Sequence, residues 1–182
     1  MLKFFTAAAM TCLLVSTAAS SAEKPKLNDA QIADIAYTAD EIDINAAKQA
    51  LDKSRNMDIR MFAQEMVADH TAVNDKATAL LKKLGVTPEP NPISKSLSDA
   101  AKEKLNDLGK LSGGNFDRAY INNEVAFHTK VDDTLRSTLI PDAQNPELKD
   151  LLKSGLKIFE EHLMHAEETV ARLRKNNVQA SR

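Results

Sequence analysis

Histidine and acidic residues interrupt the apolar stripes of four long helical segments, at Asp43, His70, Glu124, His128 and His162. Imidazole nitrogens and carboxylate oxygens bind divalent transition metals, and three His with one or two acidic residues suit Zn, Fe, Mn or Cu(II). A carboxylate in an apolar interior is also costly unless it is paired or bound to a metal. These five residues are therefore candidate ligands of one metal ion in the protein core.

Spacings of three and four residues along each segment define which side chains face inward. At 1.5 Å of rise per residue, the five polar positions fall within about two helical turns of one depth, so a single cluster is geometrically possible. The predicted inward residues are Ile32, Ala36, Ala39, Asp43, Ala46 and Ala50; Ile59, Ala63, Met66, His70, Val73, Ala77, Leu80 and Leu84; Tyr120, Glu124, Phe127, Val131 and Leu135; and Leu148, Leu152, Gly155, Phe159, His162, Ala166, Thr169 and Leu173.

Two other interpretations of the same residues remain open. The cluster could be a metal-free polar network that fixes the register of the helices, or it could perform acid–base catalysis. The sequence has no Gly-x-Ser-x-Gly nucleophile motif, no His-Glu-x-x-His motif and no glycine-rich phosphate loop, which argues against an enzyme. Asp69 is a candidate hydrogen-bond partner of a metal ligand.

Helix start and stop signals predict the segments that must position these residues. Asn28 with Gln31 forms a capping pattern, Asn56 is a second cap, Gly85 is a stop signal, and Pro146 follows a cap at Asn145. The expected long helices cover residues 28–53, 56–84, 115–140 and 145–175. A shorter amphipathic helix is expected at 98–110, after an extended proline-rich linker at 87–92.

The tight first and third connections predict two antiparallel helical hairpins. The connection of residues 86–114 is long enough to run the length of the bundle, so we expect an all-α, ferritin-like four-helix bundle with a long crossover that carries the short extra helix. A simple up-and-down bundle with a lid-like loop is the alternative. One domain is expected over residues 23–175, followed by a polar C-terminal tail at 176–182.

Composition excludes several classes of partner. The 182 residues include 24 Lys and Arg against 26 Asp and Glu, for a formal net charge of −2, so there is no basic surface for nucleic acid. With six Phe, two Tyr and no Trp, a platform for base stacking is also disfavoured. A protein partner cannot be identified from the sequence, and a homo-oligomer remains open.

The first 22 residues have the three-part pattern of a secretory signal peptide. Lys3 precedes an apolar run at residues 4–15, and Ser20 and Ala22 are the small residues before the expected cleavage site. The apolar run is too short to span a bilayer as a helix, so no integral membrane segment is expected in the mature chain. Cleavage would also remove Cys12, the only cysteine, and with it any disulfide or thiolate ligand. An exported, periplasmic protein is therefore expected.

Three motifs carry a resemblance to a known family. FAQEMVADH at residues 62–70, FDRAY at 116–120 and EVAFH at 124–128, followed by His162, resemble exported bacterial proteins of the family called domain of unknown function 4142. The resemblance implies a ferritin-like fold and an extracytoplasmic location. Many members carry an outer-membrane label, which implies a location at most. Ferritin-type di-iron sites use Glu-x-x-His, whereas Glu124 and His128 are four residues apart, which favours a mononuclear site or a purely structural use.

The favoured hypothesis is thus an exported, soluble helical bundle that binds one transition-metal ion for metal handling or envelope stress. The alternative is a structural or protein-interaction module with a metal-free buried polar network.

Overall fold

The computed structural model describes residues 26–180, and the predicted signal peptide lies outside them. Helices account for nearly all of the described part, which contains no strand. They are α1 (Asp29–Lys53), α2 (Met57–Leu84), α3 (Pro92–Gly109), α4 (Gly113–Thr134), the π-helical turn η1 (Leu135–Leu139), α5 (Ile140–Asp142) and α6 (Pro146–Ala180). None of these helices is apolar over enough of its length to cross a membrane.

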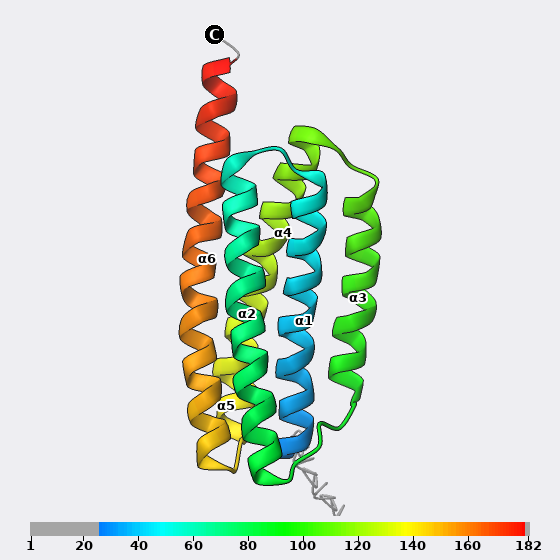
Figure 1. Ribbon diagram of the computed structural model, residues 1–182, viewed down its shortest axis with the longest axis vertical. Helices are drawn as coiled ribbons and strands as arrows, with labels where there is room; N and C mark the ends of the chain where they lie inside the picture. Colours follow the sequence, from blue (N-terminus) through cyan, green and yellow to red (C-terminus); the bar gives the residue numbers. More distant parts are fainter. Residues whose placement is uncertain (1–25, 181–182) are drawn as a thin grey trace, which may run out of the picture.

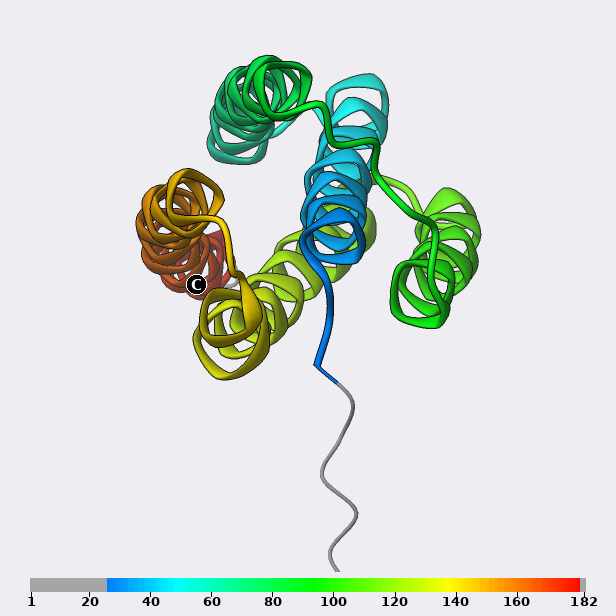
Figure 2. The ribbon, with the colours of Figure 1, turned by 90° about the horizontal axis from the view of Figure 1, so that it is seen from below.

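Helices α1, α2, α4 and α6 form a four-helix bundle (Figures 1 and 2). The hairpin of α1 and α2 packs against the hairpin of α4 and α6, and α2 contacts α6 while α1 contacts α4. Helix α3 returns along the outside of α1, so that α4 starts at the end of the bundle where α2 starts (Figure 1). The predicted all-α, ferritin-like bundle with a long crossover is confirmed.

Side-chain caps define the predicted starts of the long helices. The side chain of Asn28 accepts from the backbone N–H of Gln31, and the backbone N–H of Asn28 donates to the side chain of Gln31, which completes a capping box. Asn56 caps α2. Gly85 ends α2 with a φ of 65°, in the left-handed region that costs glycine least. The side chain of Asn145 accepts from the first turn of α6. Helix α6 continues to Ala180, so the predicted polar tail begins inside it.

The short crossover helix is longer than the sequence predicts. It begins at Pro92, six residues before the expected start at Ser98, and ends at Gly109. Asn91 caps its first turn through the N–H groups of Ile93 and Ser94, and Pro92 occupies the first helical position, where its missing N–H has no cost. The prediction was wrong at this end because Pro92 starts a helix rather than ending the linker.

The third long helix also differs from the predicted range of 115–140. It starts at Gly113 after Ser112, changes to a π-helical turn at Leu135–Leu139, and continues as α helix through Pro141 to Asp142. The proline ring would collide with the carbonyl of residue 137 in a regular α helix. The π-helical turn at Leu135–Leu139 contains this carbonyl. A wider turn of this kind lets the helix continue past the proline.

Two apolar clusters lie along the bundle, one on each side of a polar layer. One contains Phe62, Met66 and Tyr120, and the other contains Ile35, Leu135 and Leu152. Between them, all four bundle helices contribute buried acidic or imidazole side chains. The fold therefore places a polar layer in the middle of an otherwise apolar core.

Candidate metal centre

The structure brings all five predicted ligand residues into the polar layer. Asp43 lies on α1, His70 on α2, Glu124 and His128 on α4, and His162 on α6, and each is at most 1 % exposed. Ligand atoms of the three histidines lie within 4.8 Å of one another, and so do those of Asp43, Glu124 and His128. His, Asp and Glu groups are thus positioned to hold a metal ion.

The orientation of His70 is set by Asp40. The Nδ1 atom of His70 lies 2.7 Å from Oδ1 of Asp40, and a carboxylate can only accept, so Nδ1 donates. The second ring nitrogen, Nε2, then faces the carboxylate of Asp43, whose Oδ2 is 2.7 Å away. A carboxylate behind an imidazole in this manner is the usual support of a metal-binding histidine.

The orientation of His128 is set within its own helix. Its Nδ1 donates to the backbone carbonyl of Glu124, one turn earlier, over 2.9 Å. This bond fixes the tautomer because a carbonyl only accepts, and it leaves Nε2 for the polar layer. That atom lies 3.2 Å from Oδ2 of Asp43.

His162 faces in two directions. Its Nε2 donates to Oδ2 of Asp69 over 3.0 Å, and its Nδ1 lies 3.2 Å from Nε2 of His70. Asp69 is partly exposed, whereas the ring of His162 is buried. One nitrogen of this imidazole is therefore occupied at the edge of the bundle, and the other faces the interior.

Each histidine thus has one ring nitrogen bound to an acceptor and the other facing a common region beside Asp43. The distances of 2.7, 3.2 and 3.2 Å within this set match neighbouring ligand atoms that are each about 2.1 Å from one ion. In the described part of the protein, Oδ1 of Asp43 and Oε2 of Glu124 have no hydrogen-bond partner, and Oδ2 of Asp43 has only the imidazoles of His70 and His128 beside it. Buried polar atoms are rarely left in this condition.

The charged groups of the cluster shift one another's pKa values. Burial favours neutral forms, but the imidazoles of His128 and His70 outweigh it and lower the pKa of Asp43. Burial would also lower the pKa of His70, yet Asp40 and Asp43 raise it to about 10. Burial and the nearby charge of Asp43 raise the pKa of Glu124 well above its ordinary value. Without a metal, these shifts favour a protonated His70 and a protonated Glu124 beside an ionised Asp43.

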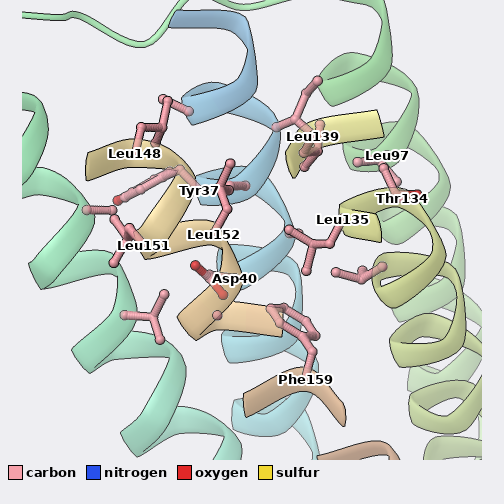
Figure 3. A pocket seen from close by; sticks show the side chains of 18 of the residues that line it. Tyr37, Asp40, Leu97, Thr134, Leu135, Leu139, Leu148, Leu151, Leu152 and Phe159 are labelled. Carbon is pink, nitrogen blue, oxygen red and sulfur yellow. The ribbon is translucent and has the colours of Figure 1, made fainter. Parts of the chain in front are cut away.

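Aromatic rings separate this cluster from solvent. The centre of the Phe159 ring lies 4.6 Å from the ring centre of His70 and 5.3 Å from that of His128. The ring centre of Phe62 lies 6.4 Å from that of His128. Beyond Phe159 is an apolar cavity of about 60 Å³, with the carboxyl group of Asp40 among leucine side chains (Figure 3). On this side the cluster therefore faces apolar side chains.

Asp40 was not predicted from the apolar stripe of its helix. It is 3 % exposed, and it lies three residues before Asp43, which places the two carboxylates on one face. That spacing is the sequence signal that could have identified it. Burial raises the pKa of Asp40, and the contact with His70 partly opposes this effect.

Comparison with known proteins identifies a family but no activity. A family model described as a domain of unknown function (DUF4142) matches residues 14–169. The chain is also similar to the crystal structure of a DUF305 protein from Streptomyces coelicolor that is described as secreted, with a TM-score of 0.66 and 10 % identity. The similarity covers 79 % of this chain and 91 % of that chain, and it shows the fold alone. No curated protein matches the chain.

Proposed function

Because the chain belongs to the DUF4142 family, whose description assigns no activity, we propose its function from the buried cluster. The protein binds one divalent transition-metal ion through Asp43, His70, Glu124, His128 and His162. Its role is metal handling outside the cytoplasm, with residues 1–22 as the export signal. The secreted description of the similar DUF305 protein supports this location.

One observation supports the proposal above the others. Three histidines on three helices each have one nitrogen bound to an acceptor, while the second nitrogen faces the others or Asp43. Once a cation displaces the proton of His70, all three imidazoles can present a lone pair to the same region beside Asp43. The unpartnered oxygens of Asp43 and Glu124 supply the negative charge that such a cation requires.

The chemistry of the donor set limits the metal. It combines imidazole nitrogens with carboxylate oxygens and has no thiolate, which suits Zn, Fe, Mn or Cu(II). A bound ion of this kind would supply a Lewis acid to the site. The chain's own residues hold the three imidazoles in fixed tautomers and exclude water from them.

Metal analysis tests the proposal directly. We expect one ion per chain in protein purified without chelator, and loss of that ion in the His70→Ala/His128→Ala double variant. Glu161→Gln, on the exposed face of α6, is the control and should retain the ion. Protein that carries no metal, and whose melting temperature does not change with Zn, Cu, Fe or Mn, would contradict the proposal.

A metal-free polar network is the second candidate, and one contact favours it. His70 lies between Asp40 and Asp43, 2.7 Å from each, so a protonated His70 could satisfy both carboxylates without an ion. In that case the His70→Ala/His128→Ala variant would lose stability while the metal content of the purified protein stayed at zero.

A further inference from the structure

A second group of acidic and imidazole side chains lies on the surface between α2 and α6. Glu65 and Asp69 are four residues apart on α2, and His162 and His165 are three apart on α6, so each pair lies on one helix face. The Nδ1 atom of His165 lies 2.6 Å from Oε2 of Glu65. Ligand atoms of Glu65, Asp69 and His162 lie within 4.8 Å of one another.

This group is open to water, unlike the buried centre. The side chains of Glu65 and Asp69 are 40 % and 48 % exposed, and that of His165 is 28 % exposed. Among the described residues, both carboxylates contact imidazoles rather than Lys or Arg. Their negative charge is therefore available to a cation that arrives from solvent.

His162 belongs to both groups. Its Nε2 contacts Asp69 at the surface, and its Nδ1 is 3.2 Å from Nε2 of His70 in the centre. Each potential ligand group on the path from the exposed carboxylates to the buried imidazoles thus lies about 3 Å from the next. A divalent ion that moves along them can exchange one ligand for the next instead of losing its hydration shell to an apolar medium.

A second approach to the centre, through the apolar cavity beside Asp40, lacks such ligands. The cavity beside Asp40 is lined mainly by apolar side chains, including Leu135, Leu152 and Phe159 (Figure 3). A cation in that cavity would lose its water ligands and gain few in return, which is costly. Of the two approaches, the surface between α2 and α6 is the one suited to a charged ion.

We propose that Glu65, Asp69 and His165, which lie beside Nε2 of His162, form a surface site that captures a divalent transition-metal cation and speeds its entry into the buried centre. This inference rests on the proposed function, because it assigns the entry route of the same ion. It adds a second, weaker and exchangeable site to the single buried one.

Stopped-flow loading with Co²⁺ tests the proposal, since visible absorption reports the ion in the buried centre. The metal-free protein is compared with the Glu65→Gln variant and with Glu161→Gln. Glu65 contacts His165 rather than a ligand of the buried centre, and the control likewise removes one exposed carboxylate, from α6. We expect the Glu65→Gln variant to load at least tenfold more slowly than the control and to reach the same final absorption.

Equilibrium titration with Zn²⁺ separates the two sites. The unaltered protein should bind one tight and one weak ion, Glu65→Gln only the tight ion, and His70→Ala/His128→Ala only the weak one. Equal loading rates in Glu65→Gln and Glu161→Gln would overturn the surface site while the tight ion preserved the proposed function. Absence of the tight ion from the unaltered protein would overturn the buried centre and the entry route with it.

Discussion

The three histidines of the buried cluster differ in the hydrogen-bond acceptor that fixes the orientation of each ring. The acceptor determines which ring nitrogen is left for a metal. His70 is supported by the carboxylate of Asp40, His128 by a backbone carbonyl of its own helix, and His162 by Asp69 at the surface. Each support occupies one ring nitrogen and directs the other into the polar layer. The cluster is therefore oriented before any ion binds, which reduces the cost of ordering ligands on binding.

Replacing Asp40 with Asn tests the support of His70. The variant removes the negative charge behind the imidazole but keeps a side chain of similar size. We expect metal affinity to fall about 10- to 100-fold, the range typical of such supporting carboxylates, with little change in helix content. Competition with a chromophoric chelator measures the affinity, and Asp52→Asn on the exposed side of α1 is the control. Equal affinities of the two variants would show that Asp40 does not support a ligand.

Asp132 is a buried carboxyl group whose Oδ1 lacks a hydrogen-bond partner in the described residues. Burial raises its pKa to about 6, so the folded state favours the protonated form. The protonated carboxyl stabilises the folded state fully at pH values below the pKa of Asp in the unfolded chain, near 4. This stabilisation is lost as the pH rises through the pKa of Asp132 in the folded chain, about 6. The native chain is thus penalised at neutral and alkaline pH.

Asp132→Asn should remove this penalty. We expect the variant to be more stable than the unaltered protein by about 1–2 kcal/mol at pH 8 and to show no gain at pH 4. Urea denaturation of chelator-treated protein at both pH values measures the effect. A gain of the same size at both pH values would mean that the titration of Asp132 is not its cause.

At the scale of single elements, helix ends were predictable where one residue type has one structural use. Asn28, Asn56 and Gly85 occupy the predicted cap and stop positions. Proline has two uses, since it can end an extended linker or begin a helix. Pro92 begins α3, and Pro141 lies within a helix beside a π turn, so both of these boundaries were predicted incorrectly.

Gly85→Ala tests the stop signal of α2. An alanine at a φ of 65° is strained, although no atom lies within 4 Å of the position that its Cβ would occupy. We expect a loss of about 1 kcal/mol in the free energy of unfolding, with unchanged metal affinity because Gly85 is 15 residues beyond His70. Thermal and urea denaturation measure the loss. Gly155→Ala, in the middle of α6, is the contrasting variant and should be neutral or slightly stabilising.

At the scale of the whole molecule, the proposed ligands come from α1, α2, α4 and α6, so one ion would link both hairpins of the bundle. An ion that binds only the folded chain stabilises it by mass action. With free Zn²⁺ at 100 times its dissociation constant, we expect about 2.7 kcal/mol of stabilisation. That corresponds to a rise of roughly 5–10 °C in melting temperature for a chain of this size.

Differential scanning fluorimetry with Zn²⁺, then with excess chelator, measures this coupling. The rise should reverse on chelation and should be absent from the His70→Ala/His128→Ala variant. A rise that persists in this variant would place the stabilising ion elsewhere in the molecule.

Periodicity in the sequence identified the inward faces of the bundle helices except in the second half of α2. There the buried residues are Asn74 and Leu81, whereas the predicted Val73, Ala77, Leu80 and Leu84 are only partly buried. The spacing of apolar residues placed Asp43, His70, Glu124, His128 and His162 inside, because an α helix repeats its faces every three to four residues wherever it lies. The loop lengths likewise favoured the ferritin-like connectivity over an up-and-down bundle. These properties are local, or depend only on chain length, so the order of residues carries them.

The tertiary structure decided what these residues contact. Which nitrogen of each histidine faces inward depends on acceptors from other helices or turns, such as Asp40 for His70 and Asp69 for His162. The pairing of Glu65 with His165 across two helices likewise depends on the axial stagger of α2 against α6. Stagger and rotation result from the packing of all side chains together, and no repeat within one helix encodes them.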